Sequence, residues 1–140
     1  MLSHDGGQSP SRAVEVLLAE SAAAPDDANV WTALAEAHAR AGEDAAAVEA
    51  YERATALSPD FAAAHFGHGT ALARLGRGEA AVAAWKCALA LDPANFVVRK
   101  QIWAHRHPEK FWPDIDTAWQ RDEMARERAG ASDLPPVPLP

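Results

Sequence analysis

The chain has 140 residues, enough for one domain, and its formal net charge is −7. Because binding to nucleic-acid phosphates needs clustered Lys and Arg, this charge argues against a nucleic-acid partner. Cys87 is the only cysteine, which excludes an internal disulfide and a cysteine-based zinc site. No run approaches the roughly 20 apolar residues of a membrane span, and the polar N-terminus lacks the order of a signal peptide. We therefore expect a cytoplasmic protein without a membrane partner.

Residues 1–9 are polar and contain Gly6 and Gly7, which predicts disorder. From residue 10 to residue 24 apolar side chains recur at helical spacing, and Pro25 follows them. Since a proline cannot continue a helix, this pattern predicts one leading helix over 10–24.

Three prolines, Pro25, Pro59 and Pro93, stand 34 residues apart, and the residues between them repeat in kind. Each interval predicts two helices, at 29–41 and 44–57 and then at 61–75 and 78–91. Gly42 and Gly76 lie just past the first helix of each pair, where a left-handed cap carries no Cβ clash. A period of this length indicates stacked helical hairpins, and with abundant alanine it predicts an all-α fold.

Small and aromatic residues recur in the same register, as a pattern of small-x3-aromatic-x2-small-x4-Pro. The chain therefore resembles the tetratricopeptide repeat family over residues 10–95. The resemblance implies a short α-solenoid, with a half-repeat at 10–24 and full repeats at 28–61 and 62–95. It also implies a non-catalytic adaptor or assembly factor that binds a protein or peptide. The residues that carry it are Ala47, Tyr51 and Ala54, repeated as Ala81, Trp85 and Ala88, and the opening Trp31-x2-Leu34-Ala35.

The resemblance further implies that the first helix of each pair lines a concave groove. The family's two-carboxylate clamp needs Lys and Asn at two helix positions, where this chain has Thr32 and Phe66, and Glu36 and Thr70. We therefore expect no binding of an acidic chaperone C-terminus. Two interpretations of the recurring arginines stay open: they meet an acidic or carbonyl feature of a partner, or they are merely solvated. The groove residues implied are Asn29, Thr32, Glu36, Arg40, Phe66, Thr70 and Arg74.

Residues 96–129 depart from the repeat and are rich in tryptophan. Asn95 is a candidate cap for a helix to about His107, and Asp114 for a last helix to about Ala129. Large aromatics here either cover the open end of the stack or form a contact surface, including a homodimer interface. The segment is similar to a tail of bacterial repeat proteins linked to redoxin-type domains, which would make a redoxin-type domain a separate partner. The candidate interface residues are Trp103, Phe111, Trp112 and Trp119.

The proline-rich residues 130–140 predict an extended polyproline tail that does not pack. His65 and His68 share one helical face. They predict either a metal site or a partly buried, hydrogen-bonded pair packed near Trp85, and we prefer the second, with no metal and no cofactor. Cys87 is expected to be a small buried packing residue. No nucleophile elbow or phosphate-binding glycine loop is present, so the sequence does not predict an enzyme.

Overall fold

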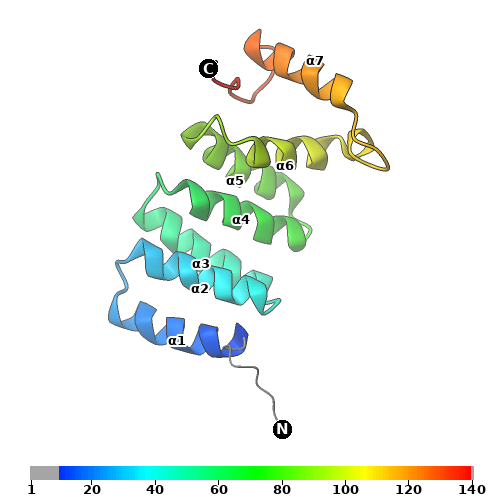
Figure 1. Cartoon of the computed structure of the whole chain (residues 1–140). Coiled ribbons are helices and arrows are strands. Elements are labelled where there is room, and N and C mark those ends of the chain that lie inside the picture. Colours follow the sequence, from blue (N-terminus) through cyan, green and yellow to red (C-terminus); the bar gives the residue numbers. More distant parts are fainter. Residues whose placement is uncertain (1–9, 140) are drawn as a thin grey trace.

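The computed structural model describes residues 10–139, so the expected disorder of residues 1–9 lies outside the described part. Within it the chain forms α-helices and one short 3₁₀ helix, and no strand (Figure 1). The all-α prediction is therefore confirmed. The elements are α1 (Pro10–Ala23), α2 (Ala28–Arg40), α3 (Asp44–Leu57), α4 (Ala62–Arg74), α5 (Gly78–Leu91), α6 (Phe96–Arg106), η1 (Pro108–Lys110) and α7 (Thr117–Arg128).

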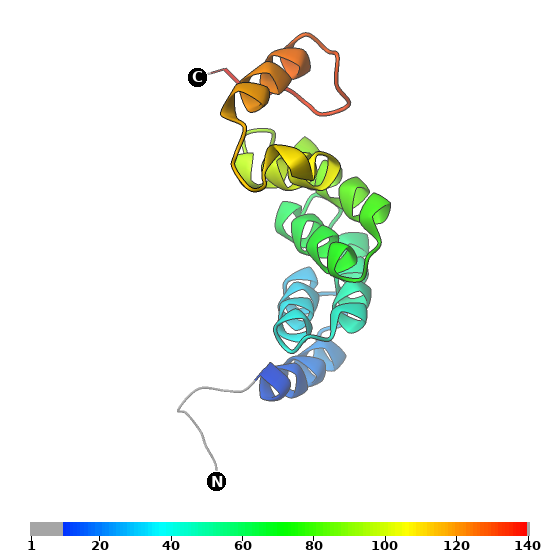
Figure 2. The ribbon, with the colours of Figure 1, turned by 90° about the vertical axis from the view of Figure 1, so that its right-hand side faces the viewer.

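Each helix from α1 to α5 packs against the next one along the chain. Helices α2, α4 and α6 lie along one side of the stack, and α3 and α5 lie along the other (Figure 2). The result is a short α-solenoid, as the sequence predicts, with α1 at one end and α7 at the other (Figure 1).

The two hairpins close in the same way because their turns have the same sequence chemistry. Gly42 and Gly76 adopt φ values of 78° and 77°, which residues with a Cβ rarely do. Just beyond them, the amide of Glu43 donates to the carbonyl of His38 over 2.9 Å, and the amide of Arg77 donates to Leu72 over 2.9 Å. These bonds satisfy carbonyls at the ends of α2 and α4. They also stabilise the turns that lead from α2 into α3 and from α4 into α5.

Two large aromatic rings pack where glycines make room for them. The Tyr51 ring, 5% exposed, lies against Gly67 of α4, and the Trp85 ring, 3% exposed, lies against Gly69 of α4. An added Cβ would lie 2.3 Å from the Tyr51 oxygen at Gly67 and 2.4 Å from Trp85 Cδ1 at Gly69. The ring of His105 covers Trp85 from α6, with centroids 6.1 Å apart. Tyr51 and Trp85 thus fill the inter-helix spaces, as expected.

A side-chain hydrogen bond repeats with the 34-residue period. Trp31 Nε1 donates to the carbonyl of Pro25 over 2.9 Å, and His65 Nε2 lies 2.8 Å from the carbonyl of Pro59. In the third unit Arg99 Nη2 donates to the carbonyl of Pro93 over 2.9 Å. Each bond ties the start of one helix to the chain leaving the preceding helix. The structural period therefore continues into α6, although the residue type changes.

The third unit differs from the first two because a large side chain replaces a small one. Trp103 stands one period after Gly69, and Trp119 stands one period after Trp85. The two indoles meet edge to face, with centroids 5.7 Å apart. Where Gly69 lets α4 and α5 approach closely, Trp103 keeps the α7 backbone away from α6 (Figure 2).

A buried ion pair joins α6 to α7 across that space. The side chains of Arg99 and Glu127 are both inaccessible to solvent and bind each other directly. Trp103 Nε1 donates to the second Glu127 oxygen over 2.9 Å. Burial raises the pKa of Glu127, and the Trp103 hydrogen bond and the Arg99 charge oppose that shift. The aromatic cap is thus held by a charged centre that the sequence did not reveal.

Three expectations about this half of the chain are wrong. The last helix begins at Thr117, because the carboxylate of Asp116, and not that of Asp114, accepts the Trp119 amide over 2.8 Å. The tail packs through residue 134, since Leu134 is 3% exposed within the core. Cys87 is exposed, because α5 turns Trp85 and its other core residues inward and Cys87 outward.

A pair of cations holds the tail. Arg106 donates to both carboxylate oxygens of Asp133, over 2.8 and 2.7 Å, and Lys86 donates over 2.9 Å. Their hydrogen bonds and charges hold the pKa of Asp133 well below its usual range. The expectation of an unpacked tail is therefore wrong as far as residue 134, because Asp133 and Leu134 have specific partners in the stack.

Candidate functional site

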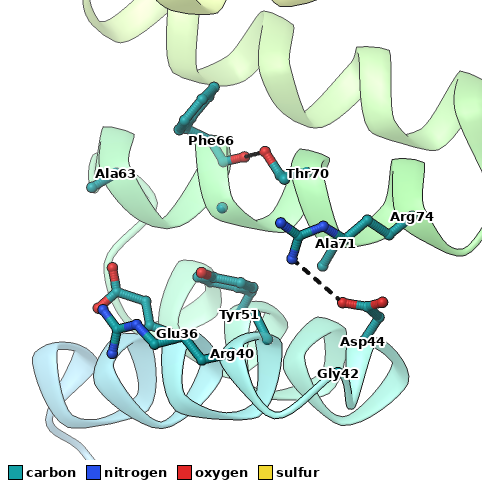
Figure 3. A pocket seen from close by; sticks show the side chains of 12 residues that line it. Glu36, Arg40, Gly42, Asp44, Tyr51, Ala63, Phe66, Thr70, Ala71 and Arg74 are labelled. Carbon is teal, nitrogen blue, oxygen red and sulfur yellow. Dashed lines mark hydrogen bonds and ion pairs between the residues drawn. The ribbon is translucent and has the colours of Figure 1, made fainter.

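A groove of about 700 Å³ opens between α2 and α4, with α3 behind it (Figure 3). Both hairpins contribute to it, because α2 and α4 are the first helices of consecutive repeats. The lining residues are Glu36, Ala39, Arg40, Gly42, Asp44, Tyr51, Ala63, Phe66, Gly67, Thr70, Ala71 and Arg74.

The structure brings together most of the groove residues that the repeat register implied. Glu36, Arg40, Phe66, Thr70 and Arg74 all line the groove (Figure 3). The two remaining residues lie elsewhere. The Thr32 side chain is buried, and its hydroxyl donates to the carbonyl of Ala28 over 2.8 Å. Asn29 is exposed in the first turn of α2, outside the groove lining.

The wall provided by α4 carries an apolar ring beside a hydroxyl. Phe66 is partly buried against the hydrophobic core, and Ala63 and Ala71 flank it along the helix. The hydroxyl of Thr70 donates back to the carbonyl of Phe66 over 3.2 Å. This wall therefore offers apolar surface with one hydroxyl already engaged as a donor.

Tyr51 supplies the floor of the groove from α3. Its ring is almost fully buried, and its hydroxyl makes no hydrogen bond with any residue that the structure describes. Burial and the charge of Glu36 raise the pKa of Tyr51 to about 12, and the charges of Arg40 and Arg74 lower it. The phenol is therefore neutral and available as a donor at neutral pH.

Sequence reasoning assigned Tyr51 to packing alone and missed this hydroxyl. The available signal was the difference from its repeat equivalent, Trp85, which has no hydroxyl. The glycine that makes room for the oxygen, Gly67, was a second signal.

The charged side chains of the groove are only loosely paired. Arg74 Nη1 lies 3.7 Å from Asp44 Oδ1, beyond hydrogen-bonding distance (Figure 3). Arg40 is exposed and forms no ion pair within residues 10–139. Both guanidinium groups can thus donate to a ligand without first breaking a strong internal bond.

Most of the aromatic residues of the C-terminal half pack against other residues of the same chain. Trp103 is 2% exposed, while Phe111 and Trp119 are partly buried against the core. The ring of Trp119 has Phe111 and His107 as neighbours, with centroids 6.4 and 5.0 Å away. Trp112, at 79% exposed, is the member of the set that faces solvent.

The histidine pair lies on the other side of α4 from the groove floor. His65 is engaged with the Pro59 carbonyl, and His68 Nε2 lies 3.9 Å from a Glu52 carboxylate oxygen. Burial lowers the pKa of His68. Among residues 10–139, no three His, Cys, Asp or Glu side chains are grouped so as to hold a metal ion. The ring packed against Trp85 is that of His105.

None of the described helices has both the length and the apolar character that crossing a membrane requires.

Comparison with known proteins identifies the class of this fold. Residues 41–76 match a family model described as TPR repeat. The first TPR of Spaghetti (RPAP3), solved with an HSP90 peptide, superposes with a TM-score of 0.68 at 23% identity, covering 71% of this chain and 79% of that one. A crystal structure of MamA gives a TM-score of 0.71 at 22% identity, covering 87% of this chain and 71% of that one. The structure described as MamA MSR-1 C2 gives 0.66 at 28% identity, covering 83% and 69%.

No curated protein matches the chain in a sequence comparison. The repeat model over residues 41–76, the helical pairs and the solved neighbours agree, and the chain has the fold of tetratricopeptide repeat proteins. Solenoids of this class use their concave surfaces for protein–protein interaction.

Proposed function

We propose that this protein is a non-catalytic adaptor or assembly factor that binds a segment of a partner protein in the groove between α2 and α4. The observation that carries the proposal is the groove itself, which is lined by apolar and uncommitted charged side chains from two consecutive repeats. The peptide complex of the first TPR of Spaghetti (RPAP3) shows that a related fold can hold a short peptide.

The same proposal assigns different roles to two parts of the chain. Residues 10–95 form the binding region, and residues 96–129 cover its end. The buried contacts of Trp103 and Glu127 support the covering role, because they join α6 to α7 within one chain. A tetratricopeptide scaffold needs such a cover, since its terminal repeat otherwise exposes an apolar face.

Co-purification from the native cell tests the proposal. The wild-type chain is compared with Phe66→Glu/Arg74→Glu, which changes one apolar and one charged lining residue. The matched control is Val97→Glu/Arg121→Glu, because both residues are exposed and lie outside the groove. Circular dichroism checks that all three chains are folded. We expect a partner that the groove variant loses and the control retains. Retention by both variants would contradict groove binding.

A second candidate is self-association through the C-terminal half, which would make the protein a structural scaffold that serves a redoxin-type partner. The observation that favours it is the exposure of two large apolar side chains in one loop, Trp112 at 79% and Ile115 at 58%. Light scattering over a range of concentrations tests it. A concentration-dependent dimer that Trp112→Ser abolishes is the expected result, and a monomer at every concentration would exclude it.

A further inference from the structure

The groove floor contains three hydrogen-bond donors that have no strong partner. The Tyr51 ring is buried at the floor, but its hydroxyl is accessible from the groove and makes no hydrogen bond within residues 10–139. Arg40 stands on the α2 side and Arg74 on the α4 side of the Tyr51 ring (Figure 3). None of these three donors has to break a hydrogen bond within the described chain before it binds an acceptor group of a ligand.

Acceptors are fewer on the same surface. Asp44 faces Arg74 and lies in the first turn of α3, where the helix dipole also stabilises its charge. That leaves Glu36 as the one other carboxylate in the lining. Two guanidinium groups and a phenol therefore face the groove together with two carboxylates, and none of these groups is hydrogen-bonded to another. The equal number of cations and acids in the lining contrasts with the repeat half as a whole, where residues 1–95 hold 13 acidic and 6 basic side chains.

We propose that the groove recognises an acidic side chain inside the bound segment, whose carboxylate accepts the Tyr51 hydroxyl and lies between Arg40 and Arg74. An apolar side chain of the same segment packs beside it on Phe66 and Ala63. The proposal rests on the proposed function, because it specifies the ligand of the same groove. The chemistry differs from capture of a C-terminal carboxylate, since the donors lie at the middle of the groove and the required clamp residues are absent.

Local geometry allows the hydroxyl to reach the groove floor. Gly67 makes room for the Tyr51 oxygen itself, because a Cβ at that position would lie 2.3 Å from it. The pKa of about 12 keeps the phenol protonated at neutral pH, so it can donate its proton to a carboxylate. Glu36 acts in the opposite direction: its charge disfavours a second acid at its side of the groove. The site therefore fits one carboxylate followed or preceded by an apolar residue, and not a run of acids.

The test begins with a displayed library of random short peptides, from which the full chain selects binders. These peptides are the probes for the affinity measurements. A selected peptide counts as a groove binder if it binds the wild-type chain and fails to bind the Phe66→Glu variant. We expect these to be enriched in one Asp or Glu near an apolar residue. A selected peptide is then made with both termini blocked, in a Glu form and a Gln form, and its affinity is measured by fluorescence anisotropy. Blocking the C-terminus removes the alternative source of a carboxylate.

Tyr51→Phe retains the ring and removes only the hydroxyl. It should weaken the Glu peptide about tenfold, as expected for loss of a hydrogen bond to a charged group, and the Gln peptide by clearly less. Arg40→Gln should weaken the Glu peptide about threefold, and Glu36→Gln should strengthen it about twofold. Arg121→Gln, exposed on α7, is the matched control and should change neither affinity.

The possible failures are distinguishable. Groove binders without an acid, or equal effects of Tyr51→Phe on the two peptides, would overturn this inference and leave the proposed function standing. A selection that yields no binder sensitive to Phe66→Glu would contradict both.

Discussion

Removal of the Glu127 carboxylate should destabilise the protein strongly, because it leaves two buried donors without their acceptor. The Arg99 side chain is inaccessible to solvent, and besides binding Glu127 it donates to the carbonyl of Pro93. Its Nε already lacks a hydrogen bond among residues 10–139. In Glu127→Ala the guanidinium charge becomes uncompensated, and the Trp103 N–H also loses its acceptor.

The expected magnitude follows from this burial. Breaking a buried ion pair by removing one partner costs about 3–5 kcal/mol, and the unsatisfied Trp103 N–H falls within the same range of effects. We therefore expect Glu127→Ala to lower the free energy of unfolding by at least about 3 kcal/mol. The assay is urea denaturation followed by far-ultraviolet circular dichroism and tryptophan fluorescence.

Two comparisons sharpen the test. Asp122→Ala removes a carboxylate from an exposed site on α7 and should change the unfolding free energy by less than about 0.5 kcal/mol. Arg99→Met/Glu127→Met replaces the pair by apolar side chains and should recover at least half of the loss, because no charge stays buried. A loss below about 1 kcal/mol for Glu127→Ala would refute the role assigned to this centre.

Three further expectations follow. Tyr51 is the only tyrosine, so the absorbance of tyrosinate reports its ionisation directly. The midpoint of the Tyr51 titration should lie near pH 12 in the folded protein and near pH 10 in denaturant. Its folded pKa is raised, so its contribution to stability is complete below about pH 10 and is lost as the pH rises through 12; a folded-state midpoint near 10 would contradict its buried position. Trp85→Ala should cost about 3–5 kcal/mol in urea denaturation by opening a cavity between α4 and α6, and a loss under about 1 kcal/mol would contradict the packing. Asp133→Asn should cost about 1 kcal/mol or less at neutral pH, because its bonds to Arg106 are partly exposed. Since the folded pKa of Asp133 is lowered, this difference should be complete above the unfolded-state pKa of about 4 and should shrink steadily as the pH falls below it. A difference that does not change with pH in the acid range would show that the carboxylate charge is not its cause.

Local signals in the sequence were sufficient for the helical stack. Pro59 and Pro93 terminate helices, and Gly42 and Gly76 turn the chain, so helix boundaries depend on neighbouring residues alone. The repeat register then placed most groove residues, because a constant period puts equivalent residues on the same face of the solenoid.

The missed features depend on residues far apart in the chain. Arg99 and Glu127 are 28 positions apart, and charged side chains are expected at the surface unless a partner is known. Asp133 and Lys86 are 47 positions apart, so composition alone predicted a free tail. The Tyr51 hydroxyl was hidden for another reason: periodicity identifies the buried ring, but it does not show where the ring's oxygen emerges.

The central claim is that a partner binds between α2 and α4, and site-specific photocrosslinking tests it most directly. A photoreactive amino acid is placed at Ala63 in the groove, and, as a control, at Glu49 on the exposed surface of α3. Both chains are irradiated in the native cell after circular dichroism has shown that they fold. The account predicts a crosslinked partner from position 63 and none from position 49. Crosslinking from position 49 alone would place the partner on another face and contradict the account.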